Sequence, residues 1–305
     1  MNAMIYECAI IGGGPAGLNA ALVLGRSRRR TIVFDDDHGR NLVTRESHGF
    51  LTRDGIRPEE LKRLGREDVA KYDCVDIEPK RIIRINRVTE THYELTTADG
   101  SVYHSIKIII AVGLKEKLPN IPDIEKFYGT SLFSCPYCDG WELQEQPLAV
   151  IADKMVFDLA KKVYNWSKDL VVFTNGEGRL EESEKSRLEA KGIIVREERI
   201  DGLEGKNGQL SNVRLEDGTL IERSGGFTTP LWTHAADFAK ELGCKQNEYG
   251  GITTDEYGRT NVWNVYAAGD AAQIVPAQLI IAAGNGSAAA IGVNGDLTNE
   301  YFDRE

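Results

Sequence analysis

A glycine-rich loop between an apolar strand and a helix near the N-terminus constrains the fold of this chain most. Residues 6–11 are a short apolar run, which is typical of a buried parallel strand. The loop 12–17 has the spacing G-x-G-x-x-G, and the Ala- and Leu-rich run 18–24 predicts a helix. A second strand is expected at 31–34. This order predicts a βαβ unit of the dinucleotide-binding kind.

Each glycine of the loop has its own physical role in such a unit. Gly12 permits the tight turn, Gly14 lets the backbone approach a pyrophosphate, and Gly17 allows close packing of helix and strand. The positive end of the helix attracts phosphate groups. Asp35 ends the second strand 18 residues after Gly17, where its carboxylate would accept hydrogen bonds from a ribose. A glycine-rich turn without a ligand is the alternative, which this context disfavours.

The rest of the chain contains the parts of two sheets. The expected elements are strands at 106–112, 148–151, 170–174 and 262–268, and helices near 156–166 and from Pro276 to 291. The middle segments form a second βαβ pattern, while the outer ones fit the N-terminal unit. The sequence therefore predicts an α/β fold of two dinucleotide-binding, Rossmann-like three-layer domains, one inserted into the other.

The length and apolar content suffice for two such domains, since 41% of the 305 residues are hydrophobic. The outer domain is expected at 1–117 and 245–305, and the inserted domain at 118–244. The chain is expected to cross between them at 115–122, which contains two prolines, and to return near 243–251.

The formal net charge of -10 disfavours nucleic acid and anionic membrane surfaces as partners. No apolar run is long enough to span a membrane, and no leader with a charged start and an apolar core is apparent. The five cysteines include only one close pair, which is not a secreted disulfide framework. We therefore expect a cytoplasmic protein.

That close pair carries the chemistry expected of the inserted domain. Cys135 and Cys138 can close into a disulfide, and the carboxylate of Asp139 can move the proton. A zinc site is one alternative, but the other three cysteines are scattered and no C-x-x-H partner is present. A structural disulfide is another alternative, which a reducing compartment disfavours.

Four motifs in order along the chain carry a resemblance to a known family. They are Gly12-x-Gly14-x-x-Gly17, Ala111-Val112-Gly113, Cys135-x-x-Cys138-Asp139-Gly140 and Tyr266-Ala267-Ala268-Gly269-Asp270. This set resembles the low-molecular-weight thioredoxin reductase flavoproteins over essentially the whole chain. Arg40-Asn41, the run 47–55 and Pro136-Tyr137 look closest to a subgroup with gliotoxin-type dithiol oxidases and bacterial proteins that lack the NADPH motif.

The resemblance implies FAD in the outer domain and a homodimer. The implied cofactor-binding residues are Gly12, Gly14, Pro15, Ala16, Gly17, Asp35, Asp36, Arg40, Asn41, His48, Gly113, Gly269, Asp270 and Gln278. Ala277 stands where the family has an arginine beside Gln278, so stabilisation of the reduced flavin is expected to be weaker. For His48 the alternative is a surface-loop histidine. His234 and Trp232 are expected to serve packing or simply to be exposed.

The resemblance also assigns the catalytic roles. Cys138 would be the thiol next to the flavin, and Cys135 the thiol that meets an external disulfide. Asp139 would be the general acid and base for the thiols. Pro136 suits the first turn of a short helix that begins at the motif.

The resemblance fails at the second nucleotide turn. The family has G-x-G-x-x-A there, whereas this chain has Ala152, Lys154 and Phe157, with Asp153 adding negative charge. The basic cluster expected for the 2′-phosphate of NADPH is replaced by an acidic stretch at 177–182. NADPH as a direct donor is therefore doubtful.

The leading hypothesis is an FAD-dependent dithiol/disulfide oxidoreductase that exchanges electrons with a thioredoxin-like protein or a small dithiol. A ferredoxin or flavodoxin would be the donor. The alternatives are a dithiol oxidase that passes electrons to oxygen, an NADPH-thioredoxin reductase with an atypical loop, and a flavin redox sensor without turnover.

Overall fold

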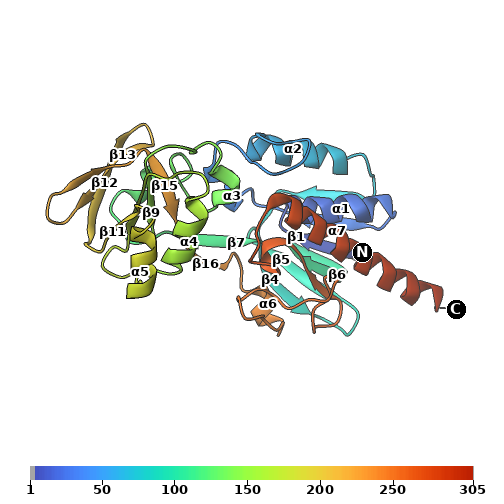
Figure 1. Cartoon of the computed structure of the whole chain (residues 1–305). Helices are drawn as coiled ribbons and strands as arrows, with labels where there is room; N and C mark the ends of the chain where they lie inside the picture. Colours follow the sequence, from blue (N-terminus) through green and yellow to red (C-terminus); the bar gives the residue numbers. More distant parts are fainter. Residues whose placement is uncertain (1–3, 305) are drawn as a thin grey trace. The chain divides into compact units, whose positions relative to one another are not determined.

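The computed structural model describes residues 4–304, which form two compact units (Figure 1). Unit 1 consists of residues up to 42, 49–115 and from 234 onward, and unit 2 of residues 43–48 and 116–233. The terminal residues of the predicted outer domain, 1–3 and 305, lie outside the described part. Each unit has its own sheets and its own apolar cores.

The chain passes from unit 1 to unit 2 and back through two short strands. These are β7 (Leu114–Lys117) and β16 (Leu231–His234), which pair with each other in a two-stranded sheet. The return therefore lies at the end of β16, before the expected 243–251. Residues 234–244 belong with unit 1 because the short helix α6 (Phe238–Glu241) buries Phe238 and Ala239 in its core.

Unit 1 contains the N-terminal βαβ unit and the C-terminal helix. Its strands are β1 (Ile5–Ile11), β2 (Thr31–Phe34), β3 (Val75–Glu78), β4 (Ile82–Arg87), β5 (Tyr93–Thr97), β6 (Val102–Ile110) and β17 (Val265–Ala267). Its other helices are α1 (Pro15–Arg26), α2 (Pro58–Val69) and α7 (Leu279–Phe302), with short 3-10 turns η1 (Arg40–Val43) and η3 (Gly269–Ala271).

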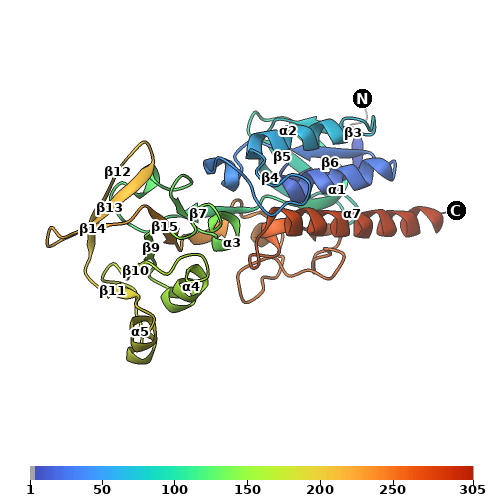
Figure 2. The same ribbon diagram turned by 45° about the horizontal axis from the view of Figure 1, so that its top comes forward.

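The seven strands of unit 1 form one mixed sheet in the order β3-β2-β1-β6-β5-β4, with β17 paired to β6. The strands β1, β2, β3 and β17 run parallel to their neighbours, and β4 and β5 are antiparallel. The sheet has an apolar core on each face. One contains α1 and α7, which lie side by side (Figure 2), and the other contains β4, β5 and α6.

Unit 2 contains the dithiol and the second βαβ pattern. Its strands are β8 (Leu132–Phe133), β9 (Leu148–Ile151), β10 (Leu170–Phe173), β11 (Ile194–Arg196), β12 (Ile200–Lys206), β13 (Gln209–Leu215), β14 (Leu220–Glu222) and β15 (Gly225–Thr228). Its helices are α3 (Pro136–Asp139), α4 (Val156–Val163) and α5 (Glu182–Glu189), with the 3-10 turn η2 (Ile124–Lys126).

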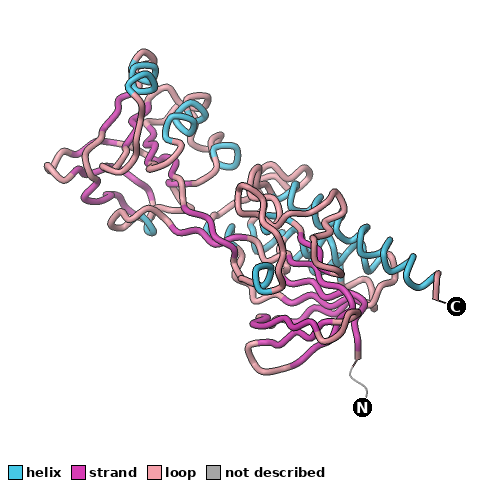
Figure 3. Tube along the Cα trace, turned by 90° about the horizontal axis from the view of Figure 1, so that it is seen from below, coloured by secondary structure: helices cyan, strands magenta, loops and turns pink. Residues whose placement is uncertain are grey.

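The main sheet of unit 2 is entirely parallel, in the order β11-β10-β9-β15-β8. An antiparallel sheet of β12, β13 and β14 accompanies it, and the strands can be followed in Figure 3. One face of the parallel sheet packs on α4 and α5, and the other on β12 and β13. Its three layers are those predicted for a Rossmann-like domain.

Several predicted elements have different bounds in the structure. The helix near 156–166 is α4, which ends at Val163, and the strand at 262–268 is β17, which spans Val265–Ala267. The strand expected at 106–112 is β6, which begins earlier, at Val102, and ends at Ile110. The helix expected from Pro276 to 291 begins at Leu279 and continues to Phe302. Gln278 has an extended backbone (φ −142°, ψ 152°), so the helix cannot begin before it.

Among residues 4–304, no helix combines the length and the apolar character needed to cross a membrane. The same residues contain no group of three His, Cys, Asp or Glu side chains arranged to hold a metal ion.

Candidate active site

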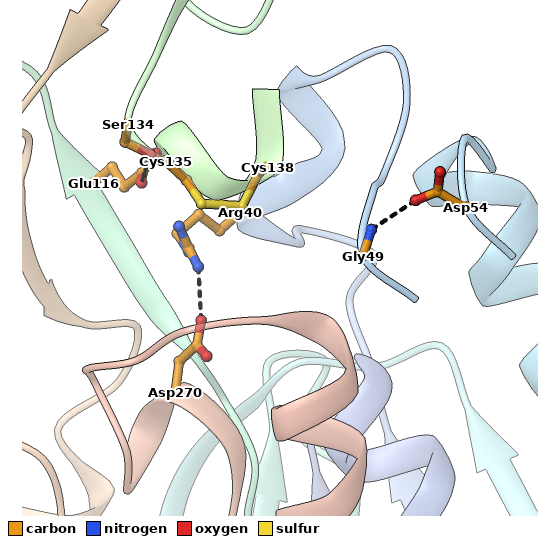
Figure 4. Close-up of a disulfide and its surroundings, with 8 residues drawn as sticks. All are labelled: Arg40, Gly49, Asp54, Glu116, Ser134, Cys135, Cys138 and Asp270. Carbon is orange, nitrogen blue, oxygen red and sulfur yellow. Dashed lines mark hydrogen bonds and ion pairs between the residues drawn. A yellow bond between two sulfur atoms is a disulfide. The ribbon is translucent and has the colours of Figure 1, made fainter. Parts of the chain in front are cut away.

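The dithiol lies at the start of a one-turn helix in unit 2 (Figure 4). Cys135 and Cys138 form a disulfide with their Cα atoms 5.3 Å apart. Cys135 has an extended backbone, and its carbonyl accepts hydrogen bonds from the amides of Cys138 (3.0 Å) and Asp139 (3.1 Å). Pro136 occupies the first helical position, where its missing N–H is not needed. The turn thus brings both sulfur atoms together before any partner binds.

The residues around this turn leave space only for glycine at position 140. A Cβ there would lie 2.4 Å from the Pro136 carbonyl oxygen and 2.7 Å from the ring of Trp166. The Trp166 ring also contacts Tyr137 edge-on, with centroids 5.8 Å apart. Tyr137 in α3 and Trp141, two residues after α3, are nevertheless 68% and 70% exposed, so two aromatic side chains close to the motif in sequence face solvent.

Asp139 is the acid of the site. Burial, and secondly the negative charge of Glu142, raise the pKa of Asp139 to about 7. A carboxyl group with this pKa holds a proton over much of the neutral range and can release it. This is the property that a general acid and base for a thiol needs.

His48 approaches the same helix from the short segment of unit 2 that precedes it in sequence. Its Nε2 lies 3.6 Å from a carboxylate oxygen of Glu142 and 3.7 Å from one of Glu46. The side chain is 17% exposed. The cofactor contact that the resemblance implies for His48 stays a prediction, and within unit 2 the side chain lies beside Glu142, the acid that influences Asp139. Glu142 itself was not predicted, although an acid four residues after Cys138 is visible in the sequence.

A second carboxylate, Glu116, stands beside Ser134, the residue before Cys135 (Figure 4). Its two oxygens accept hydrogen bonds from the side chains of Tyr128 (2.6 Å), Trp232 (3.1 Å) and Ser134 (3.4 Å). No motif marks Glu116, which lies in the segment expected to be a linker. Trp232 was expected to pack in the core or to be exposed, and its indole N–H donates a hydrogen bond to this carboxylate.

In unit 1, the glycines of the 12–17 loop differ in the space around them: Gly12 and Gly17 are closely packed, whereas Gly14 is open. A Cβ on Gly12 would lie 2.2 Å from the Ala111 carbonyl oxygen, and one on Gly17 would lie 1.8 Å from the Gly12 carbonyl oxygen. Gly14, the N-cap of α1, has no atom within 4 Å of a Cβ position and no side-chain cap. Open space over an uncapped helix start is what a pyrophosphate requires, so these residues fit a dinucleotide.

Asp35 and its neighbour are held by cations of unit 1. Asp35 is buried, and its Oδ2 lies 2.5 Å from Lys62 and 2.7 Å from Arg66. Both cations also contact Asp37, which lowers the pKa of the Asp37 carboxyl. The Asp36 carboxylate lies 3.8 Å from Arg81. The acid at the end of β2 is therefore fixed in position by α2.

Other residues implied for the cofactor lie at turns and helix starts of unit 1. Arg40 donates to Asp270 at 2.8 Å (Figure 4), and Asn41 follows Arg40 in η1. Gly269 has a φ of +66° and would place a Cβ 2.8 Å from that of Ala16, so only glycine suits this contact. The remaining implied residues are Pro15 at the start of α1, Gly113 after β6 and Gln278 at the start of α7.

The corresponding turn of unit 2 has a different geometry. The N-cap of α4 is Met155, which is left-handed (φ 52°) and 69% exposed. The Asp153 carboxylate accepts a hydrogen bond from Thr229 at 3.5 Å. His234, expected to serve packing or to be exposed, donates a 2.6 Å hydrogen bond from Nε2 to the Gly250 carbonyl oxygen in unit 1.

Comparisons with known proteins agree with this arrangement. Residues 6–286 match the family model described as pyridine nucleotide-disulphide oxidoreductase. The thioredoxin reductase aclD of Aspergillus oryzae is 29% identical over 97% of this chain and 98% of its own length. A protein of Arthroderma benhamiae named probable thioredoxin reductase is 32% identical over 56% of this chain, and that match spans only 44% of its length.

Among solved structures, TrxB of Bacillus anthracis is 44% identical, with a TM-score of 0.94 over 97% of this chain and 99% of that chain. The family implies FAD as the cofactor. The fold, the disulfide beside Asp139 and the match to residues 6–286 lead to one conclusion: the chain belongs to the pyridine nucleotide-disulphide oxidoreductase family and is a disulfide oxidoreductase of the thioredoxin reductase-like kind.

Proposed function

We propose that this protein exchanges electron pairs between FAD and an external thiol/disulfide couple through Cys135 and Cys138, without NADPH as the direct donor. The observation that carries the proposal is the Cys135–Cys138 disulfide followed directly by an acid whose pKa is raised to about 7. A merely structural disulfide has no need of such an acid.

The cofactor would be held by unit 1. Gly14 and the start of α1 would receive the pyrophosphate, and Asp35 would receive a ribose. Asp270, oriented by Arg40, and Gln278 would complete the cradle. Bound FAD would supply the capacity to accept or give two electrons.

The residues of unit 2 would carry out the exchange with the external couple. An external thiolate attacks Cys135 Sγ, a mixed disulfide forms, and the Cys135–Cys138 bond breaks. Cys138 leaves as a thiolate and takes the proton held by Asp139. The second external thiol, as its thiolate, then attacks the mixed disulfide and releases Cys135, so that the external dithiol loses two electrons and two protons. The reverse sequence reduces an external disulfide.

NADPH is excluded from the proposal because of the second turn. Ala152 and Lys154 stand where the motif has the glycines that let a phosphate approach, and the charge of Asp153 repels a phosphate. A protein electron carrier such as a ferredoxin or flavodoxin is the donor that we propose. Thioredoxin reductases among the relatives favour a thioredoxin-like partner, and we propose a cytoplasmic homodimer.

The test is an anaerobic spectral titration of the purified protein. We expect a flavin spectrum that bleaches with a dithiol and with a reduced ferredoxin or flavodoxin, but poorly with NADPH or NADH. Rapid, saturable bleaching by NADPH would contradict the proposed donor. Fast reoxidation by oxygen with continued dithiol turnover would identify an oxidase, and reduced flavin that persists with excess disulfide would identify a sensor.

A further inference from the structure

Unit 1 contains a cavity of about 590 Å³ at the edge of the sheet where β1 begins. Its lining includes Ile5 at the start of β1 and residues at the end of α7, and these two ends lie on the same side of unit 1 in Figures 1 and 2. The 12–17 loop follows the opposite end of β1, after Ile11. The cavity is therefore separate from the loop that fits a dinucleotide.

Two of the arginines near the end of α1 are engaged within unit 1. Arg29 donates hydrogen bonds to Glu7 of β1 (3.0 Å) and to two polar side chains of α7. Arg26 donates to the hydroxyl of Tyr72 at 2.9 Å. Their guanidinium groups connect elements of unit 1, which is a structural role.

Three other arginines, Arg28, Arg30 and Arg304, line the cavity and are exposed. Within the described part of the chain, no carboxylate oxygen lies within 4.0 Å of their guanidinium nitrogens. Glu7 is the acid of the lining, and its charge is paired with Arg29. The wall of the cavity thus has a local excess of positive charge on a chain whose formal net charge is -10.

Another part of the lining is apolar. It includes Ile5, Ile106 and the ring of Tyr301, and the guanidinium carbon of Arg304 lies 5.3 Å from the centre of that ring. A concave site of several hundred Å³ with apolar walls and a few convergent charged groups is the usual form of a small-molecule site. Guanidinium groups match the geometry of phosphate oxygens, which they bind through charge-assisted hydrogen bonds.

We propose that this cavity binds a phosphorylated small molecule with an apolar or aromatic body. The phosphate oxygens accept hydrogen bonds from Arg28, Arg30 and Arg304, and the body of the ligand packs on Tyr301. The inference goes beyond the proposed function, because neither the dithiol nor the 12–17 loop takes part in it.

The test measures ATP binding by isothermal titration calorimetry to the full-length protein saturated with FAD. ATP is the probe because it combines three phosphates with a flat ring, and the added FAD competes for the 12–17 loop. The variant Arg28→Gln/Arg30→Gln removes two charges from the cavity at exposed positions. The control variant Arg26→Gln/Lys71→Gln has the same net charge, but both of its positions lie outside the lining.

We expect the dissociation constant for ATP to rise at least about tenfold in Arg28→Gln/Arg30→Gln and less than about twofold in the control variant. Adenosine, which has no phosphate, should bind at least about tenfold more weakly than ATP. Absence of ATP binding to the unaltered protein would overturn the proposal, as would an equal change in the two double variants.

Cys74 reports whether ATP occupies this cavity, because its partly exposed thiol is in the lining. Saturating ATP should slow the alkylation of Cys74 by iodoacetamide at least about threefold, as followed by mass spectrometry, because the thiol reacts only when the cavity is empty. An unchanged rate of alkylation at Cys74 would place the bound ATP elsewhere and overturn the proposal.

If Arg28→Gln/Arg30→Gln does not fold, as judged by circular dichroism, Arg304→Gln carries the calorimetric test. Arg304 follows α7 and is exposed, so its replacement leaves the core unchanged. The dissociation constant for ATP should rise at least about threefold in this variant. An unchanged dissociation constant in Arg304→Gln would overturn the proposal.

Discussion

The turns 12–17 of unit 1 and 152–157 of unit 2 have the same place in two βαβ patterns but opposite chemistry. In unit 1 the helix begins at the extended Gly14, with open space above its amides. In unit 2 it begins at the left-handed Met155, after Asp153 has brought a negative charge to the turn. Topology alone therefore does not make a phosphate site; the backbone must be both exposed and free of competing side chains.

This difference explains what each unit contributes. Unit 1 has the residues that fit a dinucleotide, whereas unit 2 does not have the glycine spacing at 152–157 and contains the Cys135–Cys138 disulfide with its acid. A unit with a dinucleotide-binding topology can thus serve as a carrier for a redox-active dithiol. The following variants test this division of labour between the units.

The largest effect is expected from removal of Cys138. Cys138→Ser should reduce dithiol-driven bleaching of the flavin to background, because no disulfide remains to connect the external couple with the flavin. Cys135→Ser should also stop turnover, but should leave Cys138 as a thiolate that adds a long-wavelength absorption shoulder as pH rises. Stopped-flow spectroscopy measures both. Full turnover in both variants would show that the disulfide is structural.

The next effect is expected at Asp139. Asp139→Asn should retain the flavin and the disulfide but slow exchange by about 10²-fold, the usual scale for loss of a general acid. Because the pKa of Asp139 is raised to about 7, the group is protonated below this pH. The rate per external thiolate should therefore fall as pH rises above about 7, and Asp139→Asn should lose this dependence.

Glu142→Gln provides the matched comparison for that pH dependence. Burial remains, but the second cause of the raised pKa of Asp139, the charge of Glu142, is removed. The fall in rate should then begin at lower pH, with the maximum rate little changed. If the fall in rate begins at the same pH in Glu142→Gln, or still occurs in Asp139→Asn, the fall is due to the titration of a group other than Asp139.

A smaller effect is expected on FAD binding when an acidic side chain, like that of Asp153 in the unit 2 turn, is placed in the 12–17 loop of unit 1. A Cβ at position 14 would meet no atom within 4 Å, so the fold should persist in Gly14→Asp. Its charge would face the pyrophosphate, and FAD affinity should fall at least about tenfold. Gly14→Ala is the control, with less loss. Flavin absorbance per protein measures the FAD content of the two variants, and circular dichroism measures their folding. Full FAD content in Gly14→Asp would show that the loop is not part of the cofactor site.

The smallest effect is expected from the reverse exchange. Ala152→Gly together with Lys154→Gly should not create rapid flavin reduction by NADPH, since Asp153 and the acidic stretch at 177–182 remain. Anaerobic bleaching rates with and without NADPH measure this. Rapid reduction in the double variant would mean that the two missing glycines alone account for the difference between the turns 12–17 and 152–157.

The comparison also indicates which features could be predicted from sequence. The first and second βαβ patterns were predictable because apolar runs bounded by turns have their own local pattern, and the strands 31–34 and 148–151 have the observed bounds. The start of α7 was not, because Pro276 is a favourable first helical residue but Gln278 still has an extended backbone. At the start of α7, the tertiary structure therefore outweighs the local preference of proline for the first helical position.

For the candidate site too, only associations between residues that are close in sequence were predictable. The cysteines and Asp139 are adjacent in sequence, so their association was predictable. Glu116 was not, because its three partners lie up to 116 residues away and none forms a local motif with it. His48 was assigned by resemblance to the cofactor, whereas its contacts with Glu46 and Glu142 depend on how residues 43–48 join unit 2.

Unit 1 is assembled from three separate stretches of chain, and this has a consequence for synthesis on the ribosome. Unit 2 is almost contiguous, and all its strands are translated before β17 and α7. Unit 1 must wait for both, because β17 pairs with β6 and α7 covers α1. The dithiol-bearing unit can therefore be complete while the nascent chain still lacks the final elements of the other.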